Sequence, residues 1–394
     1  MIFYYTFGNF YSFGETVTVD FRLPKTFGSP GARHPRDSET KLSHAMVVIG
    51  PNASGKTNLI KPLSFFHWFV SRSFVDGEPK KDIPFETHFF SKDQRCEFEI
   101  ELTVGANHWR YHVALTRERV LHEALYRKTS KLFSYVFTRD WEAGAYVIRQ
   151  QGFGMSPSEA KKVRPNASLI STAAQYNVPI ALELASLPIY TNVIETGRTH
   201  PGYDGLIEAS DTFAKSERLR VRMADYLRAW DLGLADVQIR EVTFTDPTNT
   251  QVIKKPFPFG VHTLGEQSVD RIFVQESSGT QGAYLLLSRL LPALETGGLA
   301  VIDELEADLH PHMLAPILDL FLSPETNPRK AQIIFTCHAP EILTVLEKQQ
   351  IMLVEKDERG ISDAWRLDSM RGVRKDDNYY AKYMAGAYGA IPRV

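Results

Sequence analysis

The eight residues GPNASGKT, Gly50 to Thr57, decide how this chain folds. They follow a short apolar run, Ala45–Ile49, which predicts a buried strand, and they precede Asn58–Lys61, which predicts the first turn of a helix. A glycine-rich loop between a strand and a helix is the context of a phosphate-binding P-loop. Glycines permit the tight turn that points successive N–H groups at one anion, and the helix N-terminus adds partial positive charge. The alternative is a glycine-rich turn that binds nothing, and the strand and helix on either side favour the nucleotide-binding loop over it.

The side chains of this loop predict a nucleotide with β- and γ-phosphates, together with Mg²⁺, as ligands. Lys56 is expected to reach the β- and γ-phosphates and to assist catalysis, and the Thr57 hydroxyl is expected to ligate Mg²⁺. The expected nucleotide contacts from the loop are Gly50, Asn52, Ala53, Ser54, Gly55, Lys56, Thr57 and Asn58.

The composition is that of an ordinary globular protein, with 43% hydrophobic and 23% charged residues among 394. That length allows a sizeable core and two or three subdomains. The formal net charge of −2 argues against a basic face along the whole chain, although a local patch stays open. Cys96 and Cys337 lack the spacing of a zinc site or a disulfide framework. No signal peptide or transmembrane segment is predicted, so we expect a cytoplasmic protein without membrane contact.

Residues 1–95 are expected to form the N-terminal part of a nucleotide-binding core. Alternating apolar residues over 1–22 predict two short strands in a hairpin or edge pair. Residues 23–43 are rich in Pro, Gly and charge and predict a loop. The P-loop unit occupies 45–70, and its helix carries core-facing residues at helical spacing, namely Leu59, Ile60, Leu63, Phe66 and Phe69.

The middle of the chain changes its pattern twice. Period-two alternation predicts an antiparallel β subdomain over 96–155, with strands at 98–102, 109–115 and 131–137 and turns at Gly105–Asn107 and Gly144. Residues 156–236 predict a mainly helical insertion. Residues 237–275 return to short strands, with turns at Asp246-Pro247 and Pro256–Pro258.

Residues 237–394 are expected to contain the C-terminal part of the core. Helices and apolar strands alternate from residue 281, with strands at 299–302, 332–335 and 351–354 and helices at 283–294, 311–322 and from 340. Such alternation predicts an α/β fold with a parallel sheet covered on both faces. The P-loop strand should join that sheet, so that 70–275 would form one long excursion from it.

The strand Leu299–Ile302 ends in two acids, Asp303 and Glu304. In P-loop proteins the first such acid typically holds Mg²⁺, and a second acid directly after it is placed to polarise the attacking water. Strands that end in Asp-Glu are common, so this pair alone is a weak signal. Together with the P-loop it is a strong indication of nucleotide hydrolysis.

Two further segments carry a family resemblance. Ser277–Gln281, SSGTQ, resembles a degenerate form of the LSGGQ signature of ABC-type ATPases, which implies that Ser278, Gly279 and Gln281 contact nucleotide. By the same resemblance Asp303 and Glu304 are the Mg²⁺ ligand and catalytic glutamate, Asp308 is the D-loop aspartate, and His338 is the switch histidine. The order of these elements along the chain is also that of the family.

The whole set of motifs narrows the resemblance. The segments NFYSF, GPNASGKTNLIKPL, DELEADLHPHML, AQIIFTCHAPEIL, VEKD and AGAYGAIP are similar to the bacterial AAA ATPases of group fifteen. These are ABC-type relatives of the SMC, RecF and OLD ATPases and are frequent in anti-phage loci. The resemblance covers most of the first 70 residues and nearly all of 275–394. Two features depart from the family. Thr280 stands where a second glycine is usual. The Q-loop glutamine is not located, because the only candidate, Gln94, is better interpreted as a surface loop residue.

The resemblance implies a mechanism that needs two chains. The signature of one chain would cap the γ-phosphate bound to the P-loop of the other, with Ser278 as a donor. Two ATP molecules would then hold a two-fold pair together, as a homodimer or within a higher homo-oligomer, and hydrolysis would loosen it. Glu304 would orient water, and His338 would hold the γ-phosphate and sense its loss. The expected role is a dimerisation switch or sensor of a defence system, with an effector protein encoded nearby.

Other functions compete with this switch. A RecF-, SMC- or OLD-like ATPase that binds DNA stays open, and Arg218, Arg220, Arg222 and Arg228 are its candidate contacts. Only Arg218 and Arg222 have the i, i+4 spacing of one helical face, and such runs are usually solvated. A nuclease is disfavoured because Val354–Asp357 matches a Toprim segment poorly and is interpreted as the last strand with its polar exit. A small-molecule kinase or GTPase explains neither SSGTQ nor His338, and the inserted middle region argues against a transporter motor.

Overall fold

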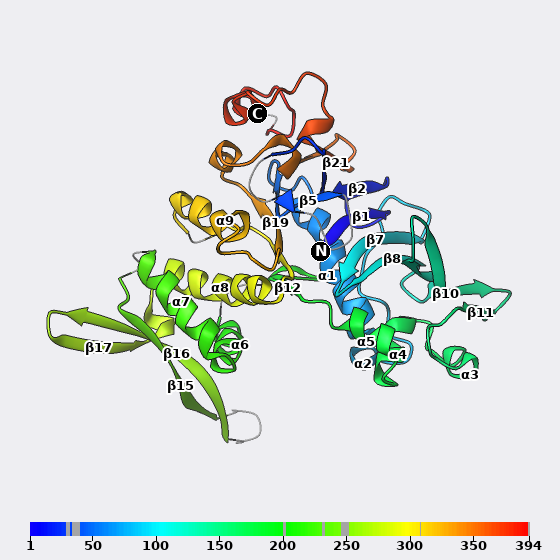
Figure 1. Cartoon of the computed structure of the whole chain (residues 1–394), viewed down its shortest axis with the longest axis horizontal. Coiled ribbons are helices and arrows are strands. Elements are labelled where there is room, and N and C mark those ends of the chain that lie inside the picture. The colour runs from blue at the N-terminus through cyan, green and yellow to red at the C-terminus, as the bar shows by residue number, and fades with distance from the viewer. Residues whose placement is uncertain are drawn as a thin grey trace.

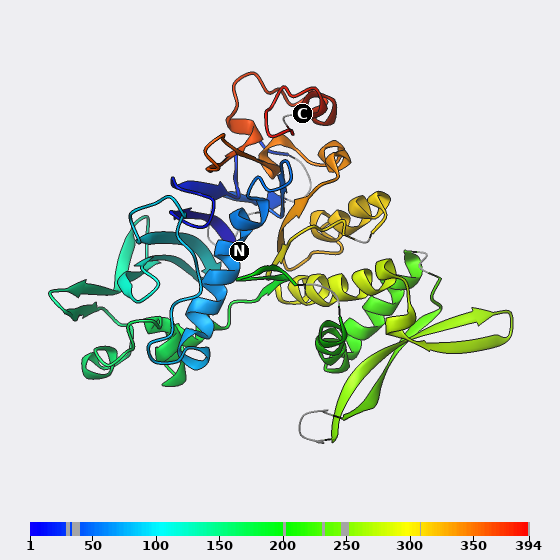
Figure 2. The same cartoon turned by 180° about the vertical axis from the view of Figure 1, so that it is seen from behind.

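A six-stranded sheet lies at the centre of the molecule, and a helix packs between it and a seven-stranded antiparallel sheet. The computed structural model describes residues 1–28, 32–33, 40–199, 202–230, 233–245, 252–307 and 309–392. In both views the strands β7–β11 with helices α3–α5 lie to one side of the centre, and helices α6–α8 with strands β15–β17 lie to the other (Figures 1 and 2).

The first sheet has six strands in the order β12-β18-β19-β6-β20-β21. Neighbouring strands from β12 to β20 pair in parallel, and β21 is antiparallel to β20. Their bounds are β6 Ala45–Ile49, β12 Ile189–Thr191, β18 Leu299–Ile302, β19 Gln332–Cys337, β20 Ile351–Lys356 and β21 Ser362–Arg366. The predicted parallel sheet containing the P-loop strand is confirmed.

This sheet separates two hydrophobic cores because alternate side chains of each strand point to opposite faces. In β6, Met46 and Val48 join one core, whereas Val47 and Ile49 join the other. The first core contains α1 (Lys56–Ser71), whose five predicted core-facing residues are all buried there. The second core contains α8 (Ser278–Thr296) and α9 (Leu314–Leu322).

The second sheet has seven antiparallel strands in the order β11-β10-β9-β8-β7-β1-β2. Their bounds are β1 Ile2–Gly8, β2 Val17–Asp20, β7 Cys96–Val104, β8 Asn107–Leu115, β9 Val120–Lys128, β10 Phe133–Glu142 and β11 Ala145–Gln150. The predicted N-terminal strand pair exists, but β1 also pairs with β7, so the pair extends the antiparallel subdomain. The predictions missed β9 and β11, and the strand expected at 131–137 begins at Phe133 and ends at Glu142.

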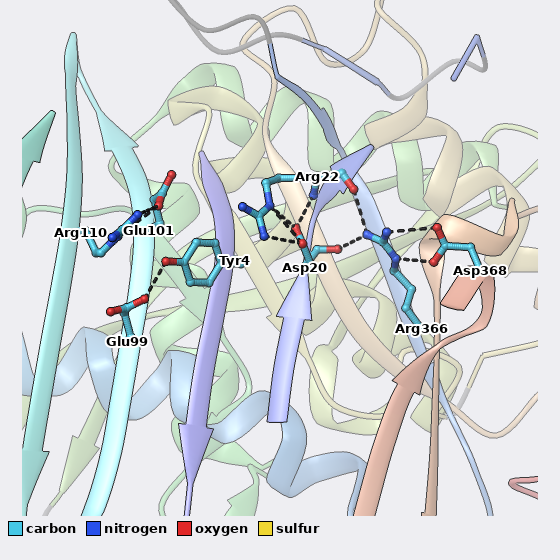
Figure 3. Close-up of polar contacts among 8 residues, drawn as sticks. All are labelled: Tyr4, Asp20, Arg22, Glu99, Glu101, Arg110, Arg366 and Asp368. Atoms are coloured by element: carbon cyan, nitrogen blue, oxygen red, sulfur yellow. Dashed lines mark hydrogen bonds and ion pairs between the residues drawn. The ribbon is translucent and has the colours of Figure 1, made fainter. Parts of the chain in front are cut away.

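Polar contacts join the two sheets where their edge strands β2 and β21 approach (Figure 3). Arg366 donates to the backbone oxygens of Asp20, at 2.7 Å, and Arg22, at 2.9 Å. Its Nε and Nη2 atoms bind both carboxylate oxygens of Asp368, at 2.6 and 3.1 Å. The guanidinium therefore fixes the end of β21 against the first strands of the chain.

The remaining elements cover these sheets or extend from them. The helices are α2 Ser73–Asp76, α3 Pro157–Ala160, α4 Leu169–Gln175, α5 Pro179–Ala185, α6 Tyr203–Ala214, α7 Glu217–Ala229 and α10 Tyr379–Met384. The other strands form three small sheets. The first contains β3 Arg22–Leu23, β4 Ala32–Arg33 and β5 Lys41–Ser43, and the second contains β13 Val193–Ile194 and β14 Gly197–Arg198. The third contains β15 Asp236–Thr245, β16 Val252–Leu264 and β17 Gln267–Ile272.

Several expectations need correction. The chain does not leave the core sheet from 70 to 275 in one excursion, because β12 returns and pairs in parallel with β18. The expected loop over 23–43 contains β5 and part of the small sheet around it. The predicted turn at Pro256–Pro258 is wrong, since both prolines lie inside β16. Strand β20 is not the last strand, because β21 follows it. The predicted turn at Asp246-Pro247 lies outside the described residues.

Candidate functional site: a P-loop cleft

The P-loop joins β6 to α1, as the sequence predicts, and helix α1 begins at Lys56, two residues earlier than expected. Both glycines of the loop, Gly50 and Gly55, are required by their surroundings. A Cβ on Gly50 would lie 2.0 Å from the backbone oxygen of Val354, and Gly55 has a φ of +112° with Ser362 Oγ 2.5 Å from its Cβ position. Ser362 also donates to the backbone oxygen of Ser54 at 2.6 Å. Strand β21 therefore helps to hold the loop in shape.

Lys56 is folded back over its own loop. Its ammonium group donates to the backbone oxygens of Gly50 and Pro51, both at 2.9 Å. Burial lowers the pKa of Lys56, and the nearby carboxylates of Asp303 and others oppose that effect. A phosphate group in the loop would supply the charged partner that these neutral carbonyls do not.

Thr57 and Asp303 meet although 246 positions separate them. The Thr57 hydroxyl donates to the two carboxylate oxygens of Asp303, at 2.9 and 3.1 Å. Thr336, at the end of β19, donates to the same carboxylate at 2.7 Å. A hydroxyl and a carboxylate are hard oxygen ligands, so these two predicted residues fit Mg²⁺ chemically.

Glu304 and His338 follow β18 and β19 at the same edge of the sheet. The carboxylate of Glu304 lies 3.6 Å from Nε2 of His338. Glu304 has a φ of +52°, a left-handed conformation that is uncommon for glutamate, and its N–H donates to the Thr336 hydroxyl at 2.7 Å. Thr336 thus contacts both acids of the pair and fixes their relative positions.

An open cleft of about 750 Å³ contains these groups. Its lining comprises Asn52, Ala53, Ser54, Gly55, Lys56, Thr57, Asn58, Asp303, Glu304, His338 and Lys356. The structure therefore brings together the predicted metal and catalytic residues and all of the predicted loop residues except Gly50, which does not line the cleft. Lys356, at the end of β20, is a cleft residue that the sequence analysis did not select.

The signature residues lie elsewhere. Ser277 caps α8 by accepting from the N–H of Thr280, and Gln281 donates to the backbone oxygen of Glu276 at 2.9 Å. Ser278 is exposed and Gly279 is half-buried, and none of the described signature residues lines the cleft of its own chain. Thr280 is buried and its hydroxyl pairs with that of Ser277 at 2.8 Å, so the departure from glycine fits locally.

Other candidates are not part of the cleft. Gln94 is exposed on the loop before β7 and does not line the cleft. Asp308 lies outside the described residues. Cys96 and Cys337 are both buried free thiols, and burial raises the pKa of each. Among the described residues, no group of three or more His, Cys, Asp or Glu is arranged to hold a metal ion, and no helix has the length and apolarity to span a bilayer.

Sequence reasoning missed two residues that contact the acidic pair. Asn192, directly after β12, accepts from the N–H of Asp303 at 2.7 Å and donates to its backbone oxygen at 3.0 Å. Arg198, in β14, lies 2.9 Å from the carboxylate of Glu304. Both come from the segment that was predicted to be helical, so no motif pointed to them.

A parallel sheet that contains the P-loop strand, an antiparallel sheet beside it and the Asp-Glu strand end define an α/β protein with a P-loop cleft, and this architecture agrees with the predicted fold class. The chain belongs to the family described as "AAA domain, putative AbiEii toxin, Type IV TA system", which matches residues 45–151 and 154–344, more than half of the chain. A similar solved structure is the SMC head domain from Thermotoga maritima, which is 13% identical with a TM-score of 0.44 and covers 93% of this chain and 98% of that one. No curated protein matches the chain.

Proposed function

We propose that this protein binds ATP with Mg²⁺, hydrolyses it in the cytoplasm, and uses it to pair with a second copy of the chain. The observation that carries this proposal is the contact of Thr57 with Asp303 inside a cleft that also holds Lys56, Glu304 and His338. Bound Mg²⁺ would be held by the Thr57 and Asp303 oxygens and would neutralise phosphate charge. Glu304 would accept a proton from the attacking water, and His338 would donate to the γ-phosphate.

The position of the signature supports the two-chain arrangement. Helix α8 presents an exposed Ser278 at its N-terminus, away from the cleft of its own chain. A helix N-terminus is suited to an anion, and the γ-phosphate of a second chain would supply one. ATP would then stabilise the pair, and its hydrolysis would release it.

The proposed role is the sensor or regulatory ATPase of a bacterial anti-phage system that controls a partner effector. The resemblance to the AAA ATPases of group fifteen supports this role. The description of the matched family also mentions a putative AbiEii toxin and a Type IV TA system. An effector encoded beside this chain is the corresponding expectation.

Glu304→Gln tests the switch. The variant should bind ATP but lose the proton acceptor, so that turnover falls by about 10²–10⁴-fold and a dimer accumulates in light scattering with ATP. Lys56→Ala is the control, because it should abolish ATP binding and leave the protein monomeric. A Glu304→Gln variant that stays monomeric at micromolar concentration and hydrolyses ATP normally would contradict the assigned roles.

The DNA-binding alternative has less support than the ATPase, because each of its candidate arginines already lies near a carboxylate of the same chain. Arg218 and Arg222 both face Glu295, at 3.0 and 3.9 Å. Arg228 binds Asp225 at 3.1 Å, and Arg220 lies 4.0 Å from Glu217. A salt-titrated DNA-binding assay with and without ATP separates the two functions, because phosphate contacts weaken steeply with salt.

A further inference from the structure

The segment from β12 to β14 contacts both acids of the catalytic pair within seven residues. Asn192 hydrogen-bonds the N–H and the backbone oxygen of Asp303. The chain then turns through the β13–β14 hairpin, in which Val193 pairs with Arg198. The N–H of Thr199 donates to the backbone oxygen of Asn192 at 2.7 Å, which closes the hairpin. Arg198 is thereby returned to Glu304.

The carboxylate of Glu304 lies in the wall between two cavities. On one side is the P-loop cleft, and on the other is a second cavity of about 280 Å³ that Arg198 lines. Oε2 of Glu304 lies 2.9 Å from Arg198, whereas Oε1 lies on the side of His338. Oε2 is thus held by Arg198 on the side of the second cavity, and Oε1 faces His338 in the nucleotide cleft.

We propose that Arg198 is a positioning residue that holds Glu304 in the orientation needed for hydrolysis. This inference rests on the proposed ATPase function. A glutamate side chain has three rotatable bonds, and its 41% exposure leaves it room to move. The charge-assisted contact from Arg198 selects the orientation in which Oε1 is directed to the cleft, in the way that a third group orients the base of a catalytic triad.

The matched control is Arg289, the other arginine in the lining of the second cavity. The side chains of Arg198 and Arg289 are 19% and 17% exposed. Arg289, however, binds Glu208 at 3.1 Å and the backbone oxygen of Thr191 at 3.2 Å. Its replacement removes the same charge from the same cavity without releasing Glu304.

The experiment measures steady-state ATP hydrolysis by Arg198→Gln, Arg198→Lys and Arg289→Gln. Arg198→Gln should lower kcat by about 10- to 100-fold with KM for ATP unchanged, because misplacement of a catalytic group by about 1 Å has such effects. Arg198→Lys should recover part of the rate, and Arg289→Gln should turn over like the wild type. In a Glu304→Gln background, adding Arg198→Gln should change nothing, because Arg198 acts through Glu304.

The outcomes distinguish a failure of the positioning role of Arg198 from a failure of the proposed ATPase function. If Arg198→Gln equals or exceeds the wild-type rate, or if its effect persists in the Glu304→Gln background, the positioning role is refuted. If the wild type does not hydrolyse ATP, or if Glu304→Gln turns over normally, the proposed function itself fails.

Discussion

Thr336 shows how one hydroxyl can organise two acids of different roles. It donates to Asp303 and accepts from the N–H of Glu304, in a position with no solvent exposure. The left-handed backbone of Glu304 is therefore stabilised by a hydrogen bond that the Thr336 hydroxyl accepts.

Thr336→Val should remove both hydrogen bonds while keeping the side-chain shape. The part-buried N–H of Glu304 and the buried carboxylate of Asp303 would each lose one hydrogen bond, which costs about 1–3 kcal/mol of unfolding free energy. Turnover should fall with little change in ATP affinity. Urea unfolding and ATPase assays measure the two effects, and Thr336→Ser, which keeps the hydroxyl, should retain most of both. A fully active, fully stable Thr336→Val variant would show that the hydroxyl is dispensable.

Among the residues of the candidate site, those inside contiguous motifs could be predicted from the sequence. Those that reach the site only through tertiary contacts could not. Lys56 and Thr57 are fixed by the geometry of their own loop, and Asp303 by its place at a strand end. Arg198 has no local signal, because its position depends on the pairing of a three-residue strand with β18.

The elements of the antiparallel side are tied together by a buried ion pair. Arg139 in β10 and Glu123 in β9 have fully buried side chains and lie 3.3 Å apart. Glu123 also accepts from the N–H of Leu169, in the first turn of α4, at 2.9 Å. Arg139 donates to the backbone oxygens of Ala167 and Arg164, both at 2.8 Å. This pair therefore fastens α4 to the sheet.

Glu123→Gln should destabilise the protein by about 3–5 kcal/mol, because it leaves a buried guanidinium without its counter-charge. The midpoint of urea unfolding measures the loss. Glu118→Gln is the control, since its carboxylate is 78% exposed and its removal should change stability by less than about 1 kcal/mol. An equal effect of the two substitutions would mean that the buried pair adds nothing.

Element types were predictable in the periodic helices α1 and α8 and in the continuous apolar runs of β6, β18, β19 and β20, whereas β12 and β21 of the same sheet were not predicted. Prediction failed where local signals competed with pairing. Pro256 and Pro258 indicate a turn, yet both lie in a long strand. They are tolerated because β17 pairs with β16 only from Phe259 onward, so β16 has one unpaired edge at the prolines.

At the scale of the whole molecule, the signature lies apart from the cleft, so under the proposed mechanism a single chain would not form a complete site. Ser278 is exposed at the start of α8, and the P-loop cleft is open to solvent on another part of the chain. Two copies related by a two-fold axis would complete two sites at once.

Ser278→Arg tests this pairing. In a Glu304→Gln background it should leave ATP affinity of the single chain unchanged but prevent the dimer, because a bulky cation replaces a small donor at the expected interface. Light scattering with ATP and a fluorescent-nucleotide titration measure the two effects. Ser158→Arg, at an exposed site in α3, should still dimerise. A dimer that forms equally well with Ser278→Arg would exclude the signature from the interface.

The prolines of β16 have a further consequence for the behaviour of the protein in solution. The unpaired edge of a long projecting ribbon invites another chain to add as a strand, which is a common start of aggregation. Pro256 and Pro258 have no N–H to offer such a strand, and the exposed Lys254 and Lys255 beside them would repel a second identical edge. The ribbon is thereby protected against self-assembly along its length, and the contacts between copies are left to other surfaces.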